Sequence, residues 1–234
     1  MNDNDSELNE VAKRLYKSLF KESGRGAILV ATTIVEEQLK ELLYSILPID
    51  FSKENKKRLF HYPGPLSSFA SKNNIAYAFR LIDQTLYDSL NSLRDIRNDA
   101  AHSPKTFELH ELNERLRNIY SLTPTLPETI KVLAKQMLLF DKTNSLNIFF
   151  EGYNLTDQEK ENKISELLSD KKSIELFEKQ IPFWELISGL WIICGLLIDN
   201  KKKLSFLSTD IRIFSEILSH NMGANMSIEG GAEH

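Results

Sequence analysis

The stretch that decides the fold runs from residue 24 to residue 47 and reads GRGAILVATTIVEEQLKELLYSIL. Its apolar residues recur every three or four positions, which places them on one face of a helix. These residues are Ile28, Ala31, Val35, Leu39, Leu42, Leu43 and Ile46. Pro48 follows directly and is expected to end the helix. The stretch therefore predicts a long helix from Ala27 to Leu47 with one apolar stripe.

The rest of the chain has a similar character. Its 234 residues include only nine glycines and seven prolines, and long stretches lack both, which favours helices over a turn-rich β fold. Periodic apolar residues predict further helices over residues 7–20, 67–82, 84–101 and 109–120, and a charged helix is expected near residues 157–179. The expected fold class is all-α. We expect a tail at residues 1–6, a single domain at 7–208, and a short helix with a disordered tail at 209–234.

Composition and charge limit the function. Hydrophobic residues make up 41% and charged residues 26%, which is ordinary for a soluble globular protein. The net charge of −4 provides no general attraction for nucleic acid. The polar, acidic N-terminus lacks the features of a signal peptide, so a cytoplasmic protein is expected. The five histidines are scattered and Cys194 is the only cysteine, so we expect neither a metal nor another cofactor.

An apolar run from Leu186 to Ile198 requires separate treatment. It has about 13 largely apolar residues, whereas a helix needs ~20 to cross a bilayer. Glu185 limits one end of the run, and Lys201–Lys203 limit the other. A buried core helix is favoured over a membrane anchor or an amphipathic surface helix. Cys194 lies within this run and is expected to be a small buried hydrophobe.

Polar chemistry is concentrated in RNDAAHSP, residues 97–104. On a helix, Asn98 and His102 share a face because they are four residues apart, and Arg94 lies one turn before Asn98. Arg97 points to another side, but its long side chain can reach around. The Ser-Pro pair that follows is expected to stop the helix. A cation, an amide and an imidazole could therefore converge at one helix end.

Such a set suits RNA cleavage without a metal ion. The 2′-hydroxyl must lose a proton, the phosphorane gains charge, and the 5′-oxygen must gain a proton. A histidine moves protons near neutral pH, and an arginine binds phosphate oxygens with a planar fork of donors. An asparagine can orient either group. One such set contains a single histidine, whereas the reaction needs both an acid and a base. Two chains meeting at this helix would supply a second set.

A purely structural interpretation of the same residues stays open. His102 could satisfy carbonyl groups at the helix C-terminus, where a positive charge is favoured. Arg97 could pair with Asp95, with Asp99 or with an acid on a neighbouring helix. The spacing alone does not separate this interpretation from the catalytic one.

Three ordered motifs carry a resemblance to a known family. RNDAAH (97–102) resembles the Arg-x4-6-His motif of the HEPN superfamily (higher eukaryotes and prokaryotes nucleotide-binding). The stretches 24–43 and GPLSSFASKNNIAYAFRLI (64–82) resemble the first two signatures of mannitol-operon repressor-like proteins, which share the HEPN-like fold. DIRNDAAH (95–102) falls where the third signature occurs, and the helix around Trp191 resembles the late apolar helix. The resemblance covers roughly residues 20–205.

The resemblance implies a HEPN-like helical bundle with additional C-terminal helices, often a homodimer. In catalytic HEPN proteins the arginine and histidine of the motif cut RNA in a composite site at the dimer interface. The matching residues are Arg97 and His102, with Asn98 beside them. The auxiliary candidates are Asp99, Arg94, Glu37 and Lys72, although Glu37 could instead be a structural ion-pair partner.

A second group of candidate residues lies in the stretch 50–66, which is expected to be a loop. Its basic residues could contact RNA phosphates, although a solvated loop is the simpler interpretation. Phe60 and Tyr62 could stack a base or could hold the loop against the bundle. The basic residues are Lys53, Lys56, Lys57 and Arg58.

Two functions follow from the resemblance. The first is a metal-independent endoribonuclease of the toxin or phage-defence kind, with RNA as substrate and a protein partner or antitoxin as its regulator. The alternative is a non-catalytic, mannitol-repressor-like transcriptional regulator that acts through protein partners. The chain has no helix-turn-helix signature or basic recognition helix, so direct DNA reading is not expected. A catalytic site predicts an accessible His102 in a positive groove, whereas a regulator predicts a buried or paired His102 and an exposed apolar patch elsewhere.

Overall fold

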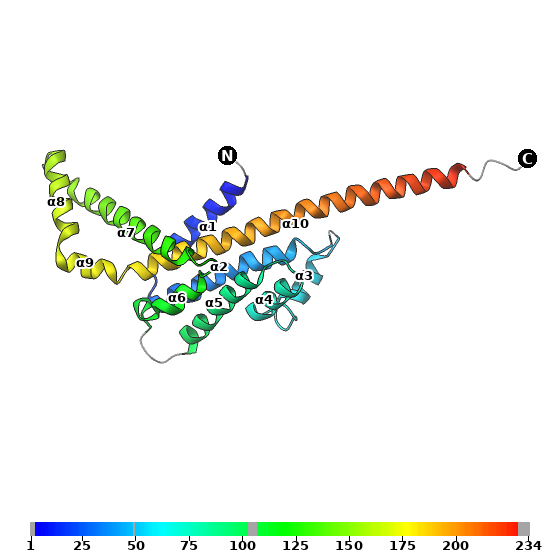
Figure 1. Cartoon of the computed structure of the whole chain (residues 1–234), viewed down its shortest axis with the longest axis horizontal. Coiled ribbons are helices and arrows are strands. Elements are labelled where there is room, and N and C mark those ends of the chain that lie inside the picture. Colours follow the sequence, from blue (N-terminus) through cyan, green and yellow to red (C-terminus); the bar gives the residue numbers. More distant parts are fainter. Residues whose placement is uncertain (1–2, 49, 103–106, 229–234) are drawn as a thin grey trace, which may run out of the picture.

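The computed structural model describes the backbone of residues 3–48, 50–102 and 107–228, and the side chains of 6–48, 50–102 and 107–204. Within these ranges the chain forms helices and no strand, which confirms the all-α fold (Figure 1). The helices are α1 Asp3–Leu19, α2 Gly24–Tyr44, α3 Lys53–Phe60, α4 Phe69–Ala78, α5 Gln84–His102, the 3-10 helix η1 Leu109–Leu112, α6 Asn113–Ile119, α7 Leu126–Phe150, α8 Asp157–Ser169, α9 Lys171–Glu178 and α10 Ile181–Ile228.

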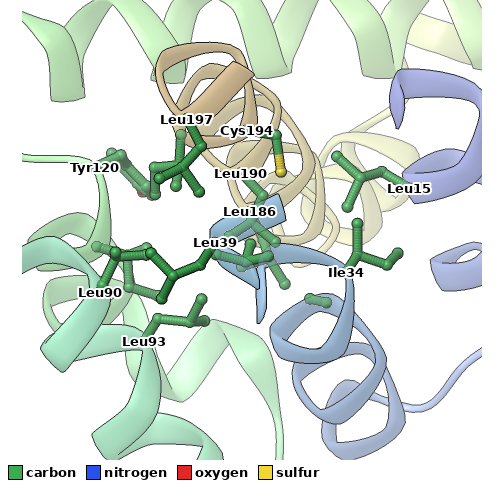
Figure 2. Packing of buried hydrophobic residues seen from close by; sticks show 14 of the residues in the cluster. Leu15, Ile34, Leu39, Leu90, Leu93, Tyr120, Leu186, Leu190, Cys194 and Leu197 are labelled. Atoms are coloured by element: carbon green, nitrogen blue, oxygen red, sulfur yellow. The ribbon is translucent and has the colours of Figure 1, made fainter. Parts of the chain in front are cut away.

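The core forms around α2, which packs against α1, α4, α5 and the first half of α10. Figure 2 shows Leu39 of α2 between Leu90 of α5 and Leu186 of α10. The predicted stripe of α2 is buried as far as Leu43, but the helix ends at Tyr44, and Ile46 beyond it is 41% exposed. The apolar period thus predicted the buried face correctly, but the helix begins three residues before the predicted start at Ala27 and ends three residues before the predicted end at Leu47.

The N-terminal end of α2 packs tightly against the chain that follows α5. The Ser23 side chain accepts a hydrogen bond from the backbone N–H of Gly26, which caps the helix. A Cβ atom on Gly24 would lie 2.8 Å from the carbonyl oxygen of Phe107. Only glycine permits this approach, and it brings Arg25 next to the end of α5.

The loop expected over residues 50–66 is wrong in its first half, because residues 53–60 form α3. The Ser52 side chain caps this helix by accepting a hydrogen bond from the N–H of Asn55. Phe60 is buried, and its ring packs edge-on against Tyr44 with the centroids 4.7 Å apart. A cap and one buried aromatic residue therefore stabilise a helix whose remaining residues are mostly charged.

The apolar run around Trp191 is part of the core. By length and composition one described helix could cross a membrane, within Lys171–Leu204, and 67% of its most apolar window is buried in the bundle. Cys194 is fully buried, as expected, and burial raises the pKa of its thiol to about 12. Glu185, at one end of the apolar run, is itself buried and only 5% exposed.

The chain ends differ from the predicted boundaries. Helix α1 already begins at Asp3, inside the expected tail, and residues 1–2 lie outside the described part. Helix α10 continues without a break across position 208 to Ile228, where a domain boundary and then a disordered tail were expected. Its C-terminal half extends away from the bundle, and α7, α8 and α9 form an arm on the other side (Figure 1). Residues 229–234 lie outside the description.

Candidate active site at the end of α5

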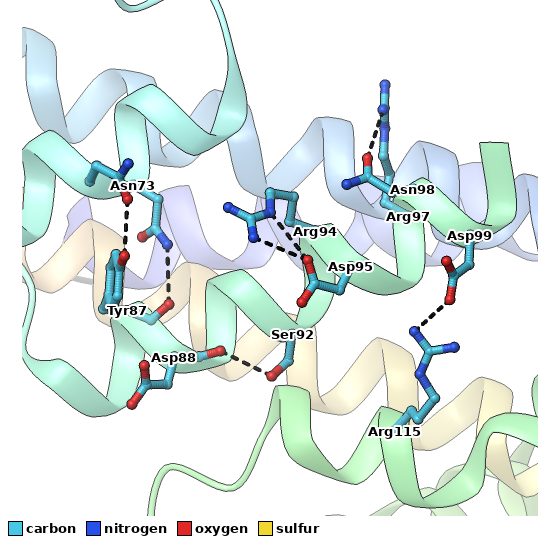
Figure 3. A network of polar contacts seen from close by, with 11 residues as sticks. Asn73, Tyr87, Asp88, Ser92, Arg94, Asp95, Arg97, Asn98, Asp99 and Arg115 are labelled. Atoms are coloured by element: carbon cyan, nitrogen blue, oxygen red, sulfur yellow. Dashed lines mark hydrogen bonds and ion pairs between the residues drawn. The ribbon is translucent and has the colours of Figure 1, made fainter. Parts of the chain in front are cut away.

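The candidate residues Arg97, Asn98 and His102 lie in the last two turns of α5. One face of α5 is buried against α2 and α4 through apolar residues such as Leu90 and Leu93, and the other face is polar (Figure 3). The helix ends at His102, close to the predicted stop. The motif therefore occupies the C-terminal end of α5, where Arg97 and His102 are exposed.

The acidic residues of the motif are paired with other cations. Arg94 bonds Asp95 at 3.1 Å, and Arg115 of α6 bonds Asp99 at 2.7 Å (Figure 3). Arg97 instead donates to the amide oxygen of Asn98 at 3.2 Å. No carboxylate among the described residues forms an ion pair with Arg97. The pairing of Arg97 with Asp95 or Asp99, one form of the structural interpretation, is absent.

His102 is exposed, and no described residue forms a hydrogen bond with its side chain. The carbonyl oxygen of Ala100, in the last turn of α5, accepts a hydrogen bond from the guanidinium of Arg25. That guanidinium also lies over the ring of Phe107, 5.8 Å from its centroid. Arg25 therefore satisfies the helix end in the way that was considered for His102.

Sequence reasoning missed Arg25, which is 75 positions from its partner Ala100. The signal was the triplet Gly24-Arg25-Gly26, since Gly24 permits the close approach of the Phe107 backbone at this point.

Arg97 and His102 point to different sides of α5. Five residues correspond to a rotation of about 140° around an α-helix, whereas Asn98 and His102 are close to one face. One copy of α5 therefore does not align the guanidinium and the imidazole side by side. A composite site with a second copy would resolve this geometry, because each chain could supply the group that the other lacks.

Glu37 and Lys72 are not brought to this helix end. Glu37 forms an ion pair with Arg14 of α1, as the structural alternative for Glu37 predicted. Lys72 is buried and bonds Glu36 at 2.6 Å. Glu36 is eleven residues beyond Arg25 along α2, a distance of about 16 Å. Both residues hold helices together, away from Arg97.

The basic residues of α3 lie at the other end of the bundle. Helix α3 follows the C-terminal end of α2, while the end of α5 lies at the N-terminal end (Figure 1). From Arg25 to Tyr44 the rise along α2 is about 28 Å. The ammonium of Lys56 lies 5.1 Å from the centroid of the Tyr44 ring, and Arg58 pairs loosely with Glu54 at 3.8 Å.

The remaining members of this basic cluster, Lys53 and Lys57, are exposed. Phe60 is buried and holds α3 in place, whereas Tyr62 is 91% exposed. Of the two aromatic residues considered for stacking on a base, only Tyr62 is therefore accessible. An RNA that contacts both α3 and the end of α5 would have to span most of the bundle.

Within the described ranges, no three side chains of His, Cys, Asp or Glu are grouped so that they could hold a metal ion. No protein-family model matches the chain, and the search of curated proteins and of solved structures gives no match. The resemblance to HEPN proteins therefore rests on the motifs quoted above and on the all-α fold.

Proposed function

We propose that the protein is a HEPN-type, metal-independent endoribonuclease of the toxin or phage-defence kind, active as a homodimer in the cytoplasm. One observation carries the proposal: Asp95, Asp99 and the carbonyl of Ala100 are bonded to other cations, while Arg97 and His102 are exposed, and Arg97 bonds only the side-chain amide of Asn98. Both side chains are therefore accessible to an RNA substrate.

In the proposed reaction His102 of one chain takes the proton of the ribose 2′-hydroxyl. The 2′-oxygen attacks the adjacent phosphorus, and the bond to the 5′-oxygen breaks. A protonated histidine from the second chain gives its proton to that oxygen, so the products carry a 2′,3′-cyclic phosphate and a 5′-hydroxyl. Arg97 stabilises the charge on the phosphorane, and Asn98 orients Arg97 through their hydrogen bond.

The proposal is tested by incubating total RNA in EDTA with wild type, His102→Ala and Arg97→Ala. His110→Ala is the matched control, because His110 is also exposed but lies outside the motif. Removing a general acid or base should reduce cleavage by about 10²- to 10⁴-fold, while the control keeps full activity. Equal cleavage by wild type and His102→Ala, or no cleavage by a folded, dimeric wild type, would argue against the proposal.

A second candidate function is a regulator that acts through a protein partner. It is favoured by apolar side chains exposed on the arm, including Phe140 (70%), Ile148 (67%), Phe149 (58%) and Leu176 (60%). A regulator would change transcript levels in cells equally well with His102→Ala, and the double variant Phe140→Ser/Phe149→Ser would abolish the effect. The nuclease predicts the opposite dependence on His102.

A further inference from the structure

A second site lies between α6, α7, the end of α9 and the start of α10, on residues other than those of the α5 motif. A cleft of about 400 Å³ opens there, within the size range of small-molecule sites. Charged side chains from all four helices line it, including Arg117, Lys131, Lys135 and Glu185. The proposed RNA cleavage uses none of these residues.

Glu185 is the most buried charged residue of the cleft, at 5% exposed. One of its carboxylate oxygens accepts a hydrogen bond from the hydroxyl of Tyr120 at 3.0 Å. Burial and the neighbouring carboxylate raise the pKa of Tyr120 well above its usual value, so this hydroxyl stays protonated and donates. No cation in the described part of the chain lies within ion-pair distance of Glu185.

The carboxylate of Glu185 has a single described hydrogen-bond partner, although a carboxylate can accept about four hydrogen bonds. Tyr120 is held in place, since the ring packs against Gly189 so closely that a Cβ there would lie 2.5 Å away. Glu185 therefore lines the cleft with acceptor capacity that no described residue uses.

Positive charges line the same cleft without contacting Glu185. Lys131 and Lys135 are one turn apart on α7 and share a face. Neither forms an ion pair with any residue that the structure describes. Arg117 is already paired with Glu128 at 2.8 Å, and the lining residues Glu114 and Glu178 are exposed to water. The cleft thus contains the buried carboxylate of Glu185 and the ammonium groups of Lys131 and Lys135. Neither ammonium group forms an ion pair with that carboxylate.

We propose that this cleft binds a small amino carboxylate, with the ligand's ammonium group on Glu185 and its carboxylate on Lys131 and Lys135. A ligand with one charge would satisfy only one side of the cleft. A zwitterion supplies donors for the desolvated carboxylate and an acceptor for the lysines in one molecule. The inference is independent of the proposed RNA cleavage.

The test measures binding by calorimetry to the full chain. The probes are glycine, β-alanine, 4-aminobutanoate and 6-aminohexanoate, which separate the two charges by increasing lengths. Butanoate and butylamine carry one charge each and serve as controls. We expect at least one zwitterion to bind with a Kd below about 1 mM and both controls to bind more weakly by about tenfold or more.

Three variants locate the site. Glu185→Gln keeps an acceptor for the hydroxyl of Tyr120 and removes the charge, and Lys135→Gln changes an exposed residue. Each should weaken binding of the best probe by about tenfold or more. Lys163→Gln, on the exposed face of α8, is the matched control and should bind as wild type does.

Three results would overturn the inference. They are no binding by any zwitterion of the series, equally tight binding of butanoate or butylamine, and unchanged binding in both cleft variants. If Glu185→Gln does not fold, Lys131→Gln and Lys135→Gln carry the test. Loss of RNA cleavage is not a readout here, so failure of this inference and failure of the nuclease proposal are distinguishable.

Discussion

Replacing Lys72 by methionine tests whether this residue is a structural cation or part of the active site. The Lys72 side chain is 4% exposed, and its ammonium bonds Glu36 at 2.6 Å and the carbonyl oxygen of Ser67 at 3.1 Å. Methionine retains most of the side-chain volume, so no cavity opens. The variant therefore isolates the loss of the charge and of its two hydrogen bonds.

The structure sets the size of the effect. Removing one partner of a fully buried ion pair costs about 3–5 kcal/mol, but Glu36 is 31% exposed and water can solvate it once Lys72 is gone. A hydrogen bond to a charged group contributes about 1.5–3 kcal/mol. We expect the free energy of unfolding to fall by about 2–3 kcal/mol. For a chain of this size the Tm should fall by about 4–12 °C.

The assay is thermal unfolding followed by circular dichroism at 222 nm. Lys57→Met, at an exposed position of α3, is the matched control and should shift the Tm by no more than about 1 °C. Adding Glu36→Gln to Lys72→Met should recover part of the loss, because the two residues interact directly. Below its Tm, folded Lys72→Met should retain RNA cleavage. An unchanged Tm, or a normal Tm with cleavage lost, would refute this reasoning.

Three other perturbations give further predictions. Glu37→Gln breaks the half-exposed pair with Arg14, so urea unfolding should show a loss of no more than about 1 kcal/mol, and RNA cleavage should not change. Gly189→Ala places a Cβ 2.5 Å from the Tyr120 ring. The resulting overpacking costs about 1–3 kcal/mol and should exceed the helix-propensity gain of about 1 kcal/mol, so the Tm should fall. A higher Tm would contradict this expectation. Burial raises the pKa of Cys194 from 9.0 to about 12, so the unfolded thiol ionises first and stability should fall as pH rises between these values. Replacing Cys194 by alanine should remove that part of the pH dependence in denaturant titrations.

The elements with a clear apolar period could be predicted well. The stripe of α2, the buried face of α5 and the apolar start of α10 all follow from spacing, because burial selects one side of a helix. Helix α3 was missed because its eight residues are mostly charged and show no stripe. It depends on a cap at Ser52 and on the packing of Phe60 against Tyr44.

By itself, the sequence determined the helical class, the buried faces and the residues of the Arg97–His102 motif, because these depend on neighbours within one or two turns. Only the tertiary structure decided how the charges are shared. Arg25 bonds the end of α5 from 75 positions away, and Glu185 meets Tyr120 from 65 positions away. The packing of helices against one another determines such partners, and the pattern of residues along the sequence does not show which helix ends meet.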